Sequence, residues 1–181
     1  FWDRFVVRVA PAENNLPYRE ASRINIHRDT WGTNLYQQIN WWAPVSNVEE
    51  KNTMIFYPDY FDVPVKNTTS TWDLNIYLAN RKKGDFSYPS APQLKEDLPS
   101  NIKKIPVTIK PGEILCFSGA HLHSSSKEKS ENTRISFEIR TICENDLKSS
   151  AQAPNVDCDL QWKFPKIFKK INDNSPLKIT S

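Results

Sequence analysis

Short extended runs, each ended by proline or by polar residues, constrain this chain more than any other feature. It has thirteen prolines but four glycines in 181 residues, and its apolar positions favour a period of two over the period of an amphipathic helix. We predict strands at 5–10, 24–27, 35–42, 54–57, 104–109, 114–117 and 133–141. Residues 72–77 fit a strand or a helix, and the polar range 79–101 is predicted to be a surface loop or lid.

The last of these runs alternates most cleanly. Four polar residues share one predicted face and three apolar residues share the other: Arg134, Ser136, Glu138 and Arg140 against Ile135, Phe137 and Ile139. Many short strands with turn signals and no strand–helix–strand rhythm predict a mainly β fold. We expect a double-stranded β-helix (a cupin-like jelly roll) with few peripheral helices, whose concave interior holds a small ligand.

Length and charge limit the classes of function. We predict a single domain over 1–181, with a core at about 5–143 and a C-terminal extension, 144–181, that packs on it. A net charge of +3 does not favour nucleic acid as a partner, and no apolar run approaches the roughly 20 residues of a membrane span. Three scattered cysteines predict a reducing, cytoplasmic setting. Because the chain begins with Phe1 rather than Met, it fits a fragment or a chain that lacks N-terminal residues.

The chain has three histidines, and their placement suggests a metal site. His27 and Asp29 form an H-x-D at the end of one predicted strand, so both side chains leave on the same face. A third ligand has to come from His121 or His123, which share a face if that strand continues. Two neutral imidazoles and a carboxylate suit non-haem Fe(II) and leave coordination positions open. Periodicity alone does not choose between the two later histidines.

Arg134 opens the strand that follows these histidines. A guanidinium offers two parallel donors to a carboxylate such as that of 2-oxoglutarate. The ordinary alternative is a solvent-facing arginine paired with Glu138, just as an isolated H-x-D is ordinarily a surface turn. The order of the motifs favours a metal site over these alternatives. An H-x-D follows one predicted strand, an H-x-H follows a turn and a second strand, and an arginine opens the next strand.

Together these segments resemble the phytanoyl-CoA dioxygenase superfamily over residues 27 to about 141. The matching segments are His27-Arg28-Asp29, Ile39 to Pro44, Asn52 to Pro58, Pro111 to Phe117, His123-Ser124-Ser125 and Arg134-Ile135-Ser136. The sequence departs from the family pattern at three points: Thr53 replaces a glycine, Asp59-Tyr60 replaces a G-S-H portion, and Ser124 stands where glycine is common. These departures predict a different loop over the site.

The resemblance implies an Fe(II)/2-oxoglutarate-dependent dioxygenase that uses O2 to hydroxylate a small-molecule substrate, with release of succinate and CO2. It favours His123 over His121 and makes His27, Asp29 and His123 the catalytic iron ligands. Arg134 and Ser136 are then expected to bind 2-oxoglutarate. Asn40 is a candidate to bind 2-oxoglutarate through its amide because it lies on the strand face expected to meet the metal, with core packing as the alternative.

Four further residues are candidates for contact with substrate, each with packing or pairing as the alternative: Trp31, Gln38, Trp42 and Arg140. Alternative functions are a metal-dependent cupin with non-oxidative activity and a cupin-like protein that binds a ligand without turnover. Nucleic acid and membrane partners are not expected, and the substrate itself cannot be assigned from the sequence.

Overall fold

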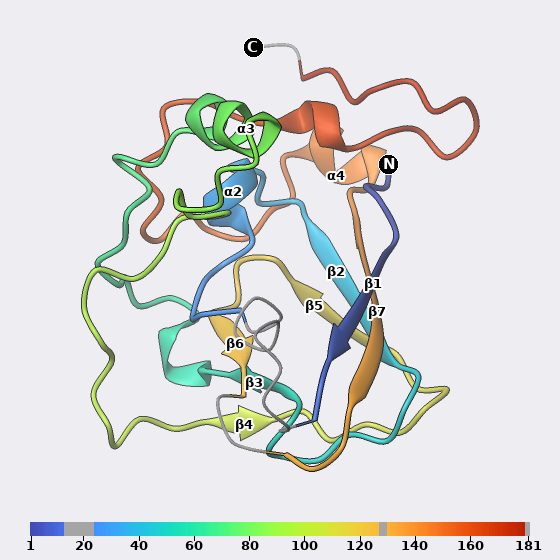
Figure 1. Cartoon of the computed structure of the whole chain (residues 1–181). Coiled ribbons are helices and arrows are strands. Elements are labelled where there is room, and N and C mark those ends of the chain that lie inside the picture. The colour runs from blue at the N-terminus through green and yellow to red at the C-terminus, as the bar shows by residue number, and fades with distance from the viewer. Residues whose placement is uncertain (13–23, 127–129, 180–181) are drawn as a thin grey trace.

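Antiparallel β-structure dominates the computed structural model, which describes residues 1–12, 24–126 and 130–179 (Figure 1). The strands are β1 (Val6–Ala10), β2 (Ile39–Pro44), β3 (Met54–Phe56), β4 (Ile105–Pro106), β5 (Leu115–Ser118), β6 (His123–Ser125) and β7 (Arg134–Thr141). The helices are α2 (Thr30–Thr33), α3 (Leu74–Lys82) and α4 (Glu144–Ser149), with 3-10 turns η1 (Pro58–Tyr60) and η2 (Pro165–Ile167). The predicted mainly β class with few helices is confirmed.

The strands form two sheets. One has the order β1-β7-β2-β5 and the other β4-β3-β6, and every pairing is antiparallel. Neighbours in space are far apart in sequence: β7 lies between β1 and β2, with Arg8 opposite Ser136 and Asn40 opposite Arg140. Chain segments from both ends and from the middle therefore meet in the larger sheet.

An apolar core joins the two sheets. Trp42 of β2 and Phe117 of β5 are buried with Met54 of β3 and with Val107. The polar face of β7 also points inward, because Arg134 and Ser136 are buried while Ile135 and Phe137 are more than a third exposed. The larger sheet therefore turns charged and hydroxyl side chains toward the interior, the reverse of the usual arrangement in a half-buried strand.

Most predicted strands are present, but several details were wrong. Residues 24–27 make only an isolated bridge, His27 to His123. The N–H of His123 donates to the carbonyl of His27, and the N–H of Ser125 donates to the carbonyl of Ile24. The segment therefore has two residues between its bonded positions where β6 has one. The extra residue interrupts the ladder, as a bulge does.

Residues 72–77, which fit a strand or a helix in the sequence, lead into a helix, because Asp73 caps α3 by accepting from the N–H groups of Asn75 and Ile76. The predicted loop 79–101 was wrong at its start, which lies inside α3. The strand expected at 114–117, which its apolar residues predict to be buried, is the edge strand β5, with Ile114 64% exposed and Phe117 buried.

The C-terminal residues contact the rest of the molecule. Phe168 is completely buried with Leu35, Ile142 and Leu177, and Trp162 lies 6.0 Å from the ring of Trp72. Within the described ranges, no helix has the length and apolar character needed to cross a membrane.

Candidate metal centre

Two imidazoles meet because their backbones are paired. His27 and His123 exchange both backbone hydrogen bonds, at 2.9 and 3.0 Å, and residues paired in this way have neighbouring side chains on the same face. Their ring centroids lie 4.3 Å apart. Residues that are 96 positions apart in sequence are thus brought together by the edge of the smaller sheet.

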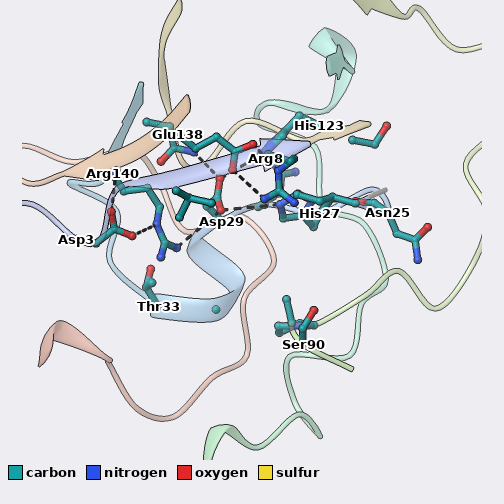
Figure 2. Close-up of a pocket in the computed structure, with 18 of the residues that line it drawn as sticks. Asp3, Arg8, Asn25, His27, Asp29, Thr33, Ser90, His123, Glu138 and Arg140 are labelled. Atoms are coloured by element: carbon teal, nitrogen blue, oxygen red, sulfur yellow. Dashed lines mark hydrogen bonds and ion pairs between the residues drawn. The ribbon is translucent and has the colours of Figure 1, made fainter. Parts of the chain in front are cut away.

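Asp29 completes a cluster with the two histidines. It precedes α2 as its N-cap residue, and the turn carries its carboxylate back toward the imidazoles (Figure 2). Its oxygens lie 3.9 Å from His27 Nε2 and 3.5 Å from His123 Nε2. One ligand atom from each of the three residues lies within 4.8 Å of the others. Among the described residues this is the group of histidine, cysteine and acidic side chains that could hold a metal ion.

The ring nitrogens are oriented for this role. The Nδ1 of His27 lies 2.8 Å from the carbonyl of Asn25, and the Nδ1 of His123 lies 2.9 Å from that of His121. These carbonyls accept only from a protonated Nδ1, so a ring in its neutral form has the lone pair of its Nε2 toward Asp29. Burial, helped by the neighbouring His27, lowers the pKa of His123 to about 4, against the opposite effect of Asp29. The ring of His123 is therefore neutral at neutral pH.

The carboxylate of Asp29 stays ionised. Burial alone would raise its pKa, but electrostatic interactions with the nearby imidazoles and with Arg140, together with a hydrogen bond from Asn40, outweigh burial and lower it. Two imidazoles and one carboxylate are a donor set that suits a divalent transition metal.

A chain of side-chain amides positions the carboxylate. Asn40 donates through its Nδ2 to Asp29 and accepts through its Oδ1 from Gln38, at 2.9 Å. Gln38 in turn accepts from Thr33 at 3.1 Å. A side chain on Gly119 would place its Cβ 2.7 Å from Gln38, so the chain needs glycine there. Asn40, predicted to bind 2-oxoglutarate, lines the cavity and donates to Asp29. Gln38, a candidate for substrate contact, is fully buried and does not line the cavity.

Arg28 was missed by the sequence reasoning, although it lies between two candidate ligands. Its guanidinium is buried and donates to Asp157 at 3.1 Å and to four backbone carbonyls: those of Tyr60, Phe61, Val63 and Ala120. The alternation of side chains along extended backbone could have predicted its role. A residue between two candidate ligands points away from them, and here that residue is an arginine whose charge has to be buried. The H-x-D is thereby tied to η1, to the segment before β6 and to the C-terminal part of the chain.

Trp31 binds the same carboxylate as Arg28, and we call this pair of contacts to Asp157 the anchor. Its indole N–H donates to Asp157 at 2.7 Å, and its side chain is completely buried in a cluster with Tyr36, Tyr57 and Leu160. Trp31 was predicted as a possible substrate contact, and the structure places it in the core instead.

His121 lies outside the metal cluster. Its ring stacks 4.4 Å from the ring of Phe61, and its Nδ1 lies 3.2 Å from the carbonyl of Ser118. Burial lowers its pKa. Of the two histidines that periodicity left open, the structure brings His123 to Asp29.

A cavity of about 750 Å³ contains the cluster and extends along the inner face of β7. Arg134 lies on its wall, 98% buried, with its guanidinium 5.8 Å from the ring of Trp42. Two side chains on the cavity wall have a buried atom without a hydrogen-bond partner in the described part of the chain: Arg134 Nε and Trp42 Nε1. The Oγ of Ser136, which is buried on the same face of β7 but does not line the cavity, has none either. Such groups are rarely left unpaired in proteins. Burial lowers the pKa of Arg134 to about 10, so it remains cationic at neutral pH.

The other charges of β7 form pairs near the mouth of the cavity (Figure 2). Arg140 binds Asp3 at 2.5 Å and lies 3.9 Å from Asp29, and Arg8 binds Glu138 at 2.5 Å. The alternative roles in which Arg134 or Arg140 pairs with Glu138 are therefore not found: Arg8 of β1 binds Glu138, and Asp3, which precedes β1, binds Arg140.

Comparison with solved structures shows the fold. EvdO2 from Micromonospora carbonacea var. aurantiaca matches with a TM-score of 0.51 at 11% identity, over 87% of this chain and 55% of that one. EvdO2 has also been crystallised with 2-oxoglutarate. The non-heme alpha ketoglutarate dependent carbocyclase SnoK from nogalamycin biosynthesis matches with a TM-score of 0.49 at 12% identity, over 97% of this chain and 58% of that one. The likeness to EvdO2 shows a shared fold.

This chain is shorter than the proteins that it resembles. It spans 55% of EvdO2 and 26% of EvdMO1. No protein-family model matches the sequence, and neither does any curated protein.

Removal of the Arg28 side chain tests the anchor. We expect Arg28→Met to lower the free energy of unfolding by about 3–5 kcal/mol, because Asp157 would be left buried without its charge partner. Urea unfolding followed by circular dichroism measures this change. The matched control is Lys66→Met, which breaks the exposed pair with Glu96 and should cost less than about 1 kcal/mol. Equal effects of the two substitutions would contradict the anchoring role.

Proposed function

We propose that this chain is an Fe(II)/2-oxoglutarate-dependent dioxygenase of the phytanoyl-CoA dioxygenase type, with a double-stranded β-helix fold, that hydroxylates a small-molecule substrate. The observation that carries the proposal is that one cavity holds both a His–Asp–His cluster and a deeply buried arginine. The shared fold with EvdO2, which binds 2-oxoglutarate in a crystal structure, supports it.

The metal cluster fits Fe(II). His27, Asp29 and His123 would hold the ion, since their Nε2 and carboxylate atoms converge and both rings are fixed through Nδ1. Three protein ligands leave the remaining positions open for a bidentate co-substrate and a gas molecule. The hydrogen bond from Asn40 orients the Asp29 carboxylate, as partners of metal ligands commonly do.

The cavity wall behind the cluster fits a carboxylate. Arg134 carries a buried charge and forms no ion pair within the described residues, because Glu138 binds Arg8. In the described part of the chain, Trp42 adds an unpaired indole N–H on the cavity wall, and Ser136 adds an unpaired hydroxyl on the same face of β7. A distal carboxylate of 2-oxoglutarate would satisfy these donors and neutralise the guanidinium, and charge-assisted bonds of this kind are about twice as strong as neutral ones.

The chemistry divides between the bound groups and the chain. When bound, Fe(II) and 2-oxoglutarate supply the activation of O2 for insertion of one oxygen atom into a C–H bond, with succinate and CO2 as co-products. The chain supplies the ligands, a fixed orientation for the co-substrate, and a site walled by Trp42 and Phe117 that limits water.

Substitution of each later histidine tests the metal site. We expect His123→Ala to weaken Fe(II) binding by more than about 100-fold, beyond the roughly 10–100-fold cost of losing an outer partner of a ligand. His121→Ala should leave metal affinity almost unchanged, because its ring packs on Phe61. Anaerobic titration of Fe(II) by calorimetry measures both affinities. Loss of binding in His121→Ala with retention in His123→Ala would reassign the ligand.

Exchange of the buried arginine tests the co-substrate site. We expect Arg134→Lys to weaken 2-oxoglutarate binding by about 10–100-fold, because an ammonium group cannot replace the planar fork and a charged hydrogen bond contributes about 1.5–3 kcal/mol. Anaerobic calorimetry gives the affinity, and succinate release with Fe(II) and O2 gives turnover. Lys82→Arg, an exchange of the same two residue types at an exposed position that does not line the cavity, is the control.

The two readouts separate the candidate functions. Unchanged affinity for 2-oxoglutarate in Arg134→Lys would remove this residue from the co-substrate site. Tight binding of 2-oxoglutarate by the wild-type chain without any succinate release would favour a protein that binds its ligand without turnover.

A further inference from the structure

One face of α3 lines the cavity that contains the metal cluster. Leu74, Tyr77, Leu78 and Arg81 all border it, and their spacing of three and four residues places them on a single side of the helix. Three apolar or aromatic side chains are thus followed by one cation at the C-terminal end. We propose that this face binds the substrate and selects an amphipathic organic anion, with the anionic group at Arg81 and the apolar body along Tyr77 and Leu78.

The guanidinium of Arg81 is held in a way that leaves its donors free. Its central carbon lies 4.3 Å from the ring centroid of Phe86 and 5.2 Å from that of Tyr77. Contacts over aromatic rings occupy the flat faces of a guanidinium and leave its N–H groups directed outward in the plane. Within the described part of the chain these N–H groups have no acceptor, and the Nε atom is buried.

The charges around the cavity favour an anion. Six arginines and three carboxylates line it: Arg4, Arg8, Arg28, Arg81, Arg134 and Arg140 against Asp3, Asp29 and Glu138. Carboxylates bind Arg8, Arg28 and Arg140. Arg134 is assigned to the co-substrate in the proposed function. Arg81 is therefore a lining cation that is held in place and forms no ion pair within the described residues, although its charge is near enough to Asp85 to help lower the pKa of that carboxyl. Arg4 is exposed.

The helix that carries Arg81 is anchored before any ligand binds. Tyr88 accepts through its hydroxyl from the N–H of Asp73, the N-cap residue, at 2.8 Å, and the indole of Trp72 donates to the carbonyl of Pro89 at 2.9 Å. Leu74 and Tyr77 pack on the buried cluster that contains Trp31 and Tyr57. A recognition surface on a fixed helix loses less entropy on binding than one on a loose loop.

Stabilisation of the helix dipole does not account for this arrangement. A cation in the last turn of a helix is favourable wherever it points. Lys82 occupies the same turn of α3 but does not line the cavity. Lys82 therefore provides a matched control for charge without cavity contact.

The inference names the substrate class for the proposed oxygenase and rests on that function, but it is tested on the metal-free protein. Fluorine NMR titration gives the affinity for 4-(4-fluorophenyl)butyrate, for the phosphate ester of 4-(4-fluorophenyl)butan-1-ol, and for the neutral alcohol. We expect Arg81→Gln to weaken binding of the preferred anion by at least about tenfold, the cost of one charge-assisted hydrogen bond. Affinity for the alcohol should not change.

Control substitutions test whether Arg81 itself accounts for the binding of the anion. Lys82→Gln removes the same charge from the same turn and should leave all three affinities unchanged, and Arg81→Lys should fall between wild type and Arg81→Gln. The two anions distinguish a carboxylate from a phosphate as the preferred group. Equal losses in Lys82→Gln and Arg81→Gln would overturn the inference, as would a loss in Arg134→Lys but not in Arg81→Gln, or no saturable binding of either anion to wild type. Failure of Fe(II) binding would count against the proposed function alone.

Discussion

The exchange of two backbone hydrogen bonds between His27 and His123 is the contact on which the rest of the site depends. It sets the separation of the two imidazoles before any side chain is considered, because paired residues in a ladder have fixed neighbours. Asp29 then reaches the pair through one turn of chain, and the buried Arg28 fixes that turn to five acceptors. The cluster is therefore held mainly by main-chain geometry, with side-chain amides adjusting the carboxylate.

The inner face of the larger sheet carries polar and charged side chains next to the cavity. Strand β7 turns Arg134 and Ser136 inward and leaves Ile135 and Phe137 partly exposed. Burial of a guanidinium without a carboxylate partner is costly, and a charged co-substrate would offset that cost. Arg81 also lines the cavity, where aromatic rings hold it and no described residue forms an ion pair with it. The cavity thus contains two arginines without an ion-pair partner among the described residues, together with the His–Asp–His cluster.

Local sequence patterns predicted the strands and the order of the motifs, and these depend on period two and on turn residues. They could not show which histidine joins Asp29, because His121 and His123 share a face and differ only in tertiary contacts. The roles of Asn40 and Arg140 also depend on tertiary partners that no local pattern shows: Asp29, on the segment before β2, and Asp3, 137 positions away from Arg140. The sequence left residues 72–77 open between strand and helix, because their conformation depends on the cap at Asp73 and on the packing of the inner face of α3.

X-ray absorption spectroscopy of the Fe(II)-loaded protein tests the central claim most directly, because it reports the atoms bound to the metal. The account predicts two imidazole ligands, recognised by their multiple scattering, together with oxygen ligands and no sulfur. A first coordination shell with fewer than two imidazoles, or with a sulfur ligand, would contradict it.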